Sequence, residues 1–396
     1  MMRRQFVSYL AGLLTIAATL LATPPSESAG RFLNPVEWGP YPVGVTTTMF
    51  VDHQRTDAYT KEDRTLVTEI WYPATDDARN LPKNKFSNFI PGGVTPQFDT
   101  LIKVAFKKPV AEIDEMFWNH AVRDARVREG KYPLIIFSHG NRGLRNQNTF
   151  WCDYLASHGY IIISADHTAN AAVTVIKGKP IFFQAKEREN SWHDRPKDLI
   201  FLLDQMALWN GGADSRFTGK IDINNTVAAG MSFGSMTAIR VADADPRFKA
   251  VIAMTGAPED HSNLNVPSLY MLGTEDRTIG VKGNDQIRAN YIKHIGPSFL
   301  LELKNGGHYS FSDVFKIDKN FGDGIGQGKR HATGEAFNYT SMEKTYLIIN
   351  SYSIAFLGYF IRGESQYLPF VLKNQWPEEL ILETKGIEKS QKTSNN

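Results

Sequence analysis

Short apolar runs recur along the chain, and helical patterns separate the later ones. The runs with the length and the β-branched or aromatic content of strands are residues 43–51, 66–72, 134–137, 161–165, 226–230, 250–254, 268–272 and 299–303. Helical periodicity covers residues 148–157, 196–208, 235–244, 286–294 and 342–361. Runs that are apolar throughout suit parallel strands covered on both faces. The alternation therefore predicts an α/β fold with a mostly parallel, doubly wound sheet.

Three departures from this alternation shape the prediction. No helical pattern separates the first two strands, so an antiparallel hairpin is expected to begin the sheet. Residues 76–130 form an insertion with a Pro/Gly-rich stretch and an amphipathic pattern, and residues 168–195 form a long mixed loop. Loops of this kind at strand ends commonly carry function.

The two ends of the chain differ in composition from the part between them. Arg3 and Arg4 precede an uncharged stretch over residues 6–22, which is typical of a secretory signal peptide, here expected over residues 1–29. A signal-anchor that stays in the membrane is the alternative, because the stretch is intermediate in length. A catalytic domain is expected over residues 30–384, followed by a disordered polar tail over residues 385–396.

Charge and cysteine content exclude several classes of protein. The net charge is only +2 and no basic run with interleaved aromatics occurs, so no nucleic-acid partner is predicted. No metal-ligand spacing is present in the sequence. Cys152 is the single cysteine, which excludes an intramolecular disulfide. Export to a bacterial periplasm or exterior is therefore predicted from the N-terminal segment alone, and the oligomeric state is left open.

The pentapeptide from Gly230 to Gly234 carries the strongest chemical signal. It reads Gly-Met-Ser-Phe-Gly and lies between a predicted strand and a predicted helix. G-x-S-x-G in that context is a nucleophile elbow, which exposes the serine on a sharp turn. Ser232 is therefore the predicted nucleophile.

A serine hydroxyl needs a base, and the base needs an orienting acid. In this arrangement the acid and then the histidine follow the serine along the chain. Asp276 follows the strand of residues 268–272, and His308 follows the strand of residues 299–303. Asp276 and His308 are the predicted acid and base, and Glu275 is the alternative acid because it is one residue away.

The oxyanion of the reaction needs two backbone N–H donors. One is expected from Phe233, directly after the serine. The other is expected from Asn141, in the glycine-containing loop after the first parallel strand. His139 is expected to fix this loop rather than to react, and the residues expected to border the substrate are His139, Gly140 and Met231.

These segments together resemble platelet-activating-factor acetylhydrolases and bacterial dienelactone-hydrolase-like esterases. The resemblance rests on residues 133–140 (PLIIFSHG), 155–160 (LASHGY), 39–44 (GPYPVG), 71–73 (WYP), 195–198 (RPKD) with 202–204 (LLD), and Gly307-His308 with 311–313 (FSD). It covers about residues 39–362. It implies an α/β-hydrolase fold, no cofactor, and hydrolysis of short acyl esters, with phospholipids among the candidates.

One departure separates the chain from the animal acetylhydrolases. Their pattern places the acid after the strand that follows the nucleophile helix, where this chain has Thr255, which cannot ionise. Asp276, one strand further on, resembles the acid of dienelactone hydrolases and cutinase-like polyester hydrolases. Dienelactone hydrolases proper have a cysteine where this chain has Ser232.

The sequence thus predicts an exported serine esterase acting on short-chain or lipid-like esters. A polyester or xenobiotic esterase of the cutinase or dienelactone-hydrolase type is one alternative. A non-catalytic exported binding protein on a hydrolase scaffold is another. Apolar residues in the amphipathic pattern of residues 98–117 and in Ile181-Phe182-Phe183 also predict transient contact with a membrane or micelle surface, unless they cover the core.

Overall fold

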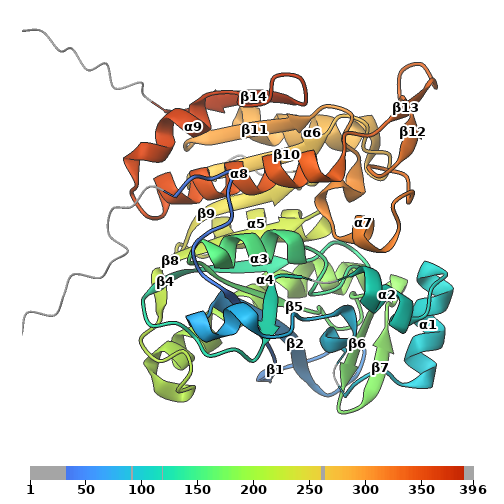
Figure 1. Cartoon of the computed structure of the whole chain (residues 1–396), viewed down its shortest axis with the longest axis vertical. Coiled ribbons are helices and arrows are strands. Elements are labelled where there is room, and N and C mark those ends of the chain that lie inside the picture. The colour runs from blue at the N-terminus through green and yellow to red at the C-terminus, as the bar shows by residue number, and fades with distance from the viewer. Residues whose placement is uncertain (1–32, 91, 118, 260–263, 388–396) are drawn as a thin grey trace, which may run out of the picture. The chain divides into compact units, whose positions relative to one another are not determined.

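A ten-stranded sheet runs through the part of the chain that the computed structural model describes, namely residues 33–90, 92–117, 119–259 and 264–387 (Figure 1). The strands follow one another across the sheet as β14 (Leu380–Lys385), β11 (Ser298–Leu303), β10 (Ser268–Gly273), β9 (Phe248–Met254), β8 (Ile221–Met231), β4 (Tyr132–Ser138), β5 (Ile161–Ala165), β2 (Asp63–Pro73), β1 (Val43–Thr56) and β3 (Ala121–Arg123). The expected signal peptide lies outside the described residues.

The strand directions confirm the predicted fold class. From β5 through β4, β8, β9 and β10 to β11, each strand is parallel to its neighbour. The hairpin of β1 and β2 is antiparallel, and β2 adds antiparallel to β5. Because every parallel strand ends at the same edge, the loops after β4, β8, β10 and β11 meet there.

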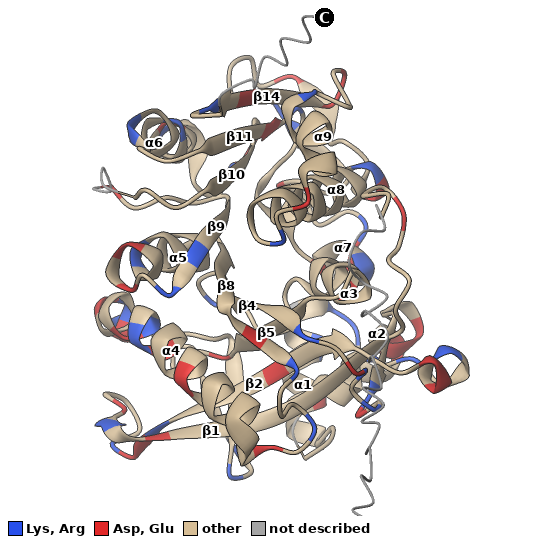
Figure 2. Cartoon of the chain, turned by 90° about the vertical axis from the view of Figure 1, so that its left-hand side faces the viewer, with Lys and Arg blue, Asp and Glu red and all other residues tan. Residues whose placement is uncertain are grey.

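Helices cover both faces of the sheet (Figure 2). One face carries α4 (Arg188–Leu208), α5 (Phe233–Ala244) and α6 (Gly280–Lys293), and the other carries α3 (Thr149–Ser157), α8 (Met342–Phe360) and α9 (Leu368–Leu372). In β4, Leu134 and Ile136 pack into the core on the side of α4, α5 and α6. Ile135 and Phe137 pack into the core on the side of α3, α8 and α9. Alternate side chains of one strand thus fill two cores, which is why its sequence is apolar throughout.

Several details of the prediction are wrong. The helix expected from Pro196 begins at Arg188, so Pro196 lies inside α4, although proline is best tolerated in the first turn. The loop before it contains a hairpin of β6 (Val173–Ile176) and β7 (Lys179–Phe182). At the other end, β14 includes Lys385, which pairs with Ser298, so no tail starts at residue 385. Residues 388–396 lie outside the described residues.

The insertion over residues 76–130 is largely helical. It contains η1 (Asp76–Asn80), η2 (Phe86–Phe89), α1 (Pro96–Phe106) and α2 (Val110–Met116). The Thr95 side chain accepts from the Phe98 N–H at 3.2 Å, and Pro96 occupies the first turn, so the sequence itself starts α1. None of the helices in the described ranges is long and apolar enough to cross a membrane.

Candidate active site

The turn between β8 and α5 holds Ser232 in a backbone conformation that few non-glycine residues adopt. Its φ is 58° and its ψ is −120°, and residues in such conformations typically cost about 1–3 kcal/mol each. Two glycines permit the close approach that the turn needs. A Cβ on Gly230 would collide with the backbone of Gly234, and one on Gly234 would collide with the carbonyl oxygen of Ser138. The strand–turn–helix geometry of a nucleophile elbow is therefore present.

The start of α5 lies directly after the serine. Phe233 is the first residue of this helix, so its N–H has no partner inside the helix. The aligned peptide dipoles of the helix favour negative charge at this end. The Ser232 N–H is already used, since it donates to the Met254 carbonyl at 2.7 Å. The N–H of Phe233 therefore remains available to a developing oxyanion beside the serine.

Asp276 and His308 are brought together from two neighbouring strand ends. Asp276 follows β10 and is fully buried, and His308 begins η5 (His308–Phe311) after β11. Asp276 Oδ2 lies 2.7 Å from His308 Nδ1. Its other oxygen accepts from the N–H groups of Thr278 and Ile279, each at 3.0 Å. The carboxylate is thus fixed by its own turn, and it leaves the Nε2 side of the imidazole for chemistry.

Glu275, the alternative acid, faces a different partner. Its Oε1 accepts from Arg330 at 3.2 Å and its Oε2 from the His331 N–H at 2.9 Å. Arg330 and His331 lie between β12 (Gln327–Lys329) and β13 (Ala336–Asn338). Glu275 therefore anchors this hairpin, and it is Asp276 that contacts His308.

The segment that carries His308 and the turn that carries Ser232 border the same loop. The side-chain amide of Gln147 donates to Met231 Sδ at 2.7 Å, and the backbone carbonyl of Gln147 accepts from the Asp313 N–H at 2.9 Å. The next side chain, Asn148, donates to the Phe311 carbonyl at 2.7 Å. Residues 147–148 therefore connect the two segments, although the Ser232 hydroxyl makes no hydrogen bond with the described residues. Loose contacts of this kind are usual in sites without substrate.

The loop over residues 138–143, called the oxyanion loop below, lies against the serine. A Cβ built on Gly140 would be 3.4 Å from the Cβ of Ser232. The Gly140 N–H donates to Gln147 Oε1 at 3.1 Å, whereas the N–H of Asn141 has no acceptor among the described residues. The Asn141 side chain is held by Asn170, which donates to it at 3.1 Å. The geometry is thus compatible with the Asn141 N–H as the second oxyanion donor.

Two of the residues expected to border the substrate, His139 and Met231, are buried behind the surface of the site. His139 is fully buried, and burial holds the pKa of its imidazole well below the usual range, with the positive charge of Arg195 adding to the shift. Met231 is 2% exposed. The expectation that His139 contacts substrate therefore does not fit the structure, whereas its expected part in fixing the loop does. Gly140 alone of the three lies on the serine side.

Thr255, which stands where the animal acetylhydrolase pattern has its acid, is fully buried with a φ of 50°. Its hydroxyl has no hydrogen-bond partner within the described structure. Its N–H donates to the Met271 carbonyl at 2.8 Å, which joins the ends of β9 and β10. Thr255 therefore connects two strand ends at the edge of the sheet that carries the site, but it contributes no charge there.

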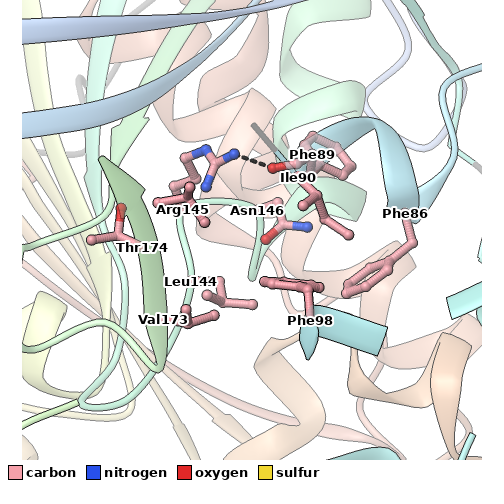
Figure 3. A pocket seen from close by; sticks show the side chains of 10 residues that line it. Phe86, Phe89, Ile90, Phe98, Leu144, Arg145, Asn146, Val173 and Thr174 are labelled. Atoms are coloured by element: carbon pink, nitrogen blue, oxygen red, sulfur yellow. Dashed lines mark hydrogen bonds between the residues drawn. The ribbon is translucent and has the colours of Figure 1, made fainter. Parts of the chain in front are cut away.

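An apolar pocket lies beside the oxyanion loop (Figure 3). It has room for only about 20 Å³ of solvent, roughly one water molecule, and it widens where it opens to the surface. Its walls come from η2, α1, β6 and the residues that follow the oxyanion loop. The apolar residues that line it are Phe86, Phe89, Ile90, Phe98, Leu144, Val173 and Val175. Ordinary ligand pockets are lined in this way, with a few polar groups that fix orientation. The described residues contain no cluster of His, Cys, Asp or Glu that could hold a metal ion.

Sequence reasoning missed a buried polar cluster behind the site. Arg195, Asp198 and His167 are all fully buried, and they reach the oxyanion loop through hydrogen bonds. Arg195 and Asp198 lie three residues apart on one helix, but this spacing is common on solvated helix faces and does not show that the side chains point inward.

The chain is similar to two families of esterases and to several known proteins. The family model described as platelet-activating factor acetylhydrolase, isoform II, matches residues 27–196, and the model described as PET hydrolase-like matches residues 126–320. A platelet-activating factor acetylhydrolase from Cavia porcellus is 25% identical over 377 residues, which cover 84% of this chain and 79% of that protein. The Bos taurus acetylhydrolase is 26% identical over 263 residues, covering 54% of this chain and 53% of that protein.

A solved structure supports the fold. The ferulic acid esterase from Streptomyces cinnamoneus superimposes with a TM-score of 0.65 at 22% identity, covering 82% of this chain and 91% of that chain. The strand order and the elbow define an α/β-hydrolase fold. The family models and relatives that the chain matches describe carboxylic ester hydrolases, namely platelet-activating factor acetylhydrolases and PET hydrolase-like proteins.

Replacing each carboxylate of the turn after β10 separates their roles. Asp276→Asn should lower kcat/KM by about 10⁴-fold, as the same change does in other triads, because an amide no longer selects the imidazole tautomer that accepts the serine proton. Glu275→Gln should stay within about threefold of the wild type, since Glu275 contacts only the β12–β13 hairpin. Steady-state hydrolysis of p-nitrophenyl acetate measures both, and the opposite ranking would assign the acid to Glu275.

Proposed function

We propose that the chain hydrolyses carboxylic esters through Ser232, His308 and Asp276, with an acyl-enzyme intermediate. The observation that carries this proposal is the Asp276–His308 contact of 2.7 Å at the same sheet edge as a strained serine elbow. Neither feature is needed for packing alone. A strained backbone and a buried carboxylate–imidazole pair both cost stability, and such costs concentrate at functional sites.

The proposed reaction is acyl transfer in two steps. His308 Nε2 removes the proton of the Ser232 hydroxyl as its oxygen attacks the ester carbonyl. The carbonyl oxygen becomes an oxyanion, which the N–H groups of Asn141 and Phe233 stabilise. Collapse of the tetrahedral intermediate expels the alcohol, which takes the proton from His308. Water then attacks the acyl-enzyme by the same steps, while Asp276 holds the imidazole and stabilises its charged form.

Short-chain or lipid-like esters are the proposed substrates. The acetylhydrolase relatives, by their name, remove an acetyl group from platelet-activating factor. The apolar pocket beside the oxyanion loop supports an apolar group on the acyl or alcohol side of the ester. No cofactor is required by this chemistry.

A polyester or xenobiotic ester is the second candidate. The PET hydrolase-like model matches residues 126–320, a range that includes Ser232, Asp276 and His308. The acetylhydrolase model ends at residue 196, before all three. A comparison of a short-chain phospholipid, a ferulate ester and an aromatic polyester oligomer would separate the candidates by kcat/KM.

Export of the enzyme is also proposed, on the basis of Arg3, Arg4 and the uncharged stretch after them. The mature protein from its native host should begin between about Thr23 and Arg31, because signal peptides have roughly that length. N-terminal sequencing of the periplasmic or secreted fraction measures this. Retention of Met1 in a membrane fraction would instead support a signal-anchor.

Removal of the serine hydroxyl tests the proposed function directly. Ser232→Ala should lower kcat by at least about 10⁴-fold, because the loss of a nucleophile leaves only binding and oxyanion stabilisation. It should also abolish labelling by a fluorophosphonate probe. The melting temperature should remain near that of the wild type, since alanine fits the same turn.

Ser365→Ala serves as the matched control, because Ser365 is an exposed serine far along the chain. This variant should label and hydrolyse as the wild type does. Turnover by Ser232→Ala within about tenfold of the wild type would contradict the proposed nucleophile.

Contact with a micelle or membrane surface is proposed for the region around the pocket. Leu101 and Val104 on α1 are 39% and 65% exposed, and Phe182 on β7 is 38% exposed. The Phe183 ring is only partly exposed and is covered by Arg142 of the oxyanion loop. The guanidinium carbon of Arg142 lies 5.2 Å from the centre of the ring. The exposed residues therefore form the surface to test, and Phe183 belongs to the scaffold.

A double substitution on α1 tests this surface. Leu101→Ser with Val104→Ser should impair hydrolysis of micellar lipid esters severalfold, because the apolar contact with the aggregate is lost. Hydrolysis of soluble p-nitrophenyl acetate should change less than twofold. Ile292→Ser with Ile295→Ser, at the exposed end of α6, is the matched control. Equal losses on both substrates, or equal losses in the control, would show that α1 has no part in surface binding.

A further inference from the structure

A fully buried arginine lies under the oxyanion loop. Arg195, on α4, donates from Nη1 to the carbonyl of His139 at 2.5 Å and to Ser138 Oγ at 3.3 Å. From Nη2 it donates to the carbonyl of Gly140 at 3.2 Å and to the side-chain oxygen of Asn170. One guanidinium thus holds consecutive residues of the loop from behind.

The bond to Gly140 fixes the peptide that carries the proposed oxyanion donor. The carbonyl of Gly140 and the N–H of Asn141 belong to one peptide unit, in which they point in opposite directions. That carbonyl accepts from Arg195 at 3.2 Å, from His139 Nδ1 at 2.7 Å and from the Gly143 N–H at 3.0 Å. Three donors on one face of the peptide hold the Asn141 N–H on the other face. A cationic donor also polarises the peptide, which makes its N–H a better donor.

The tautomer of His139 is determined by the same contacts. The N–H of His167 donates to His139 Nε2 at 3.1 Å, so Nε2 is the acceptor. The proton therefore resides on Nδ1, which donates to the Gly140 carbonyl. His139 and Arg195 act on the same oxygen.

The second proposed donor, Phe233, contacts the same guanidinium. The Arg195 guanidinium carbon lies 4.6 Å from the centre of the Phe233 ring, within the range of a cation–π contact. The ring belongs to the residue whose N–H follows Ser232. Arg195 therefore touches both residues that supply the oxyanion donors, and it does so from the side away from substrate.

A network of charges holds Arg195 in its buried position. Burial lowers the pKa of Arg195, and the nearby carboxylate of Asp198 opposes this shift. Burial works to raise the pKa of Asp198, but Arg64, which donates to it at 2.6 and 2.7 Å, outweighs this effect and keeps the carboxyl ionised. Arg55 donates to the same carboxylate at 2.9 Å. The β1–β2 hairpin thereby anchors α4 beneath the site.

A second series of hydrogen-bonded Ser, His and Asp side chains lies within this network. Ser138 Oγ lies 2.9 Å from His167 Nε2, and His167 Nδ1 lies 2.8 Å from Asp198 Oδ2. Burial, followed by the charge of Arg195, lowers the pKa of His167 to about 3, so the imidazole is neutral. Ser138, His167 and Asp198 are at most 1% exposed, so no ester reaches them. This chain serves as a support for the loop.

We propose that Arg195 is a positioning residue for the oxyanion hole, setting the direction of the Asn141 N–H and the place of Phe233. The proposal rests on the proposed function. Loss of the planar guanidinium, which donates to the carbonyls of both His139 and Gly140, should lower the rate of acyl transfer. The binding of substrate in the ground state should change little, because the oxyanion develops only on the way to the transition state.

Arg195→Lys tests the proposal, because lysine keeps the charge but cannot bind two carbonyls in one plane. We expect kcat for p-nitrophenyl acetate to fall about 10- to 100-fold, with KM within about threefold, since removing an oxyanion donor outright typically costs 10²–10³-fold. Affinity for a boronate analogue of the tetrahedral intermediate should fall in parallel with kcat/KM. The pH profile of kcat/KM should keep its wild-type midpoint, since His308 and Asp276 are untouched. Active sites are counted by fluorophosphonate labelling carried to completion.

Arg362→Lys is the matched control, because Arg362 also donates to two backbone carbonyls, those of His158 and Gly159, and also lies over an aromatic ring, but none of its hydrogen bonds reaches the oxyanion loop. It should lower the melting temperature comparably and leave kcat per active site within about threefold. Wild-type kcat in Arg195→Lys, or equal kcat losses in both variants at matched loss of stability, would overturn the positioning role.

If Arg195→Lys does not fold, Asn170→Ala decides the question, because Asn170 links Arg195 to the Asn141 side chain. A fall in kcat of at least about fivefold at constant KM supports the proposal, being smaller than the loss of a whole donor, and an unchanged kcat overturns it. Failure of the proposed function gives a different result, since the wild type itself would then neither label with fluorophosphonate nor hydrolyse esters.

Discussion

The backbone at Ser232 is the constraint on which the arrangement of the site depends. A residue with φ of 58° can be held there only if neighbouring strands and a helix pack against it without gaps. Gly230 and Gly234 remove the side chains that would prevent this packing, and the closest approach is to the carbonyl of Ser138 at the end of β4. The elbow and the oxyanion loop are therefore built on one backbone contact, so the serine and the loop keep a fixed relation.

The polar cluster behind the loop follows from that contact. Once β4 ends against the elbow, the carbonyls of His139 and Gly140 turn into the protein and need donors. Arg195 supplies them, but a buried cation needs an anion, which is Asp198, and Asp198 in turn is shared with Arg64. Each step supplies a partner for the group before it, although Arg195 Nε and Arg55 Nη2 have no hydrogen-bond partner among the described residues. The chain of partners ends at the half-buried Arg55, near solvent.

The sequence allowed the order and type of the main strands to be predicted, because β4, the second half of β8 and β10 are short, mainly apolar runs. It did not reveal β14, whose last three residues, Glu383, Thr384 and Lys385, are polar and exposed, or the start of α4, where Pro196 is typical of a first turn. Motif spacing found Ser232, Asp276 and His308 because the chemistry demands those residue types after strands. Arg195 was missed because nothing in its spacing shows that the side chain points inward.

In a parallel sheet, more than one strand end lies at the edge that carries the site, and here the acid follows β10 rather than β9. β9 and β10 are neighbours and end at the same edge, where the Thr255 N–H bonds to the Met271 carbonyl. Both strand ends therefore lie close to the loop after β11 that carries His308. Asp276, which the N–H groups of its own turn fix in place, is the carboxylate that contacts Nδ1 of that imidazole. Thr255 leaves a buried hydroxyl without a hydrogen-bond partner at the neighbouring strand end, and such a group costs stability wherever the charge of the site lies.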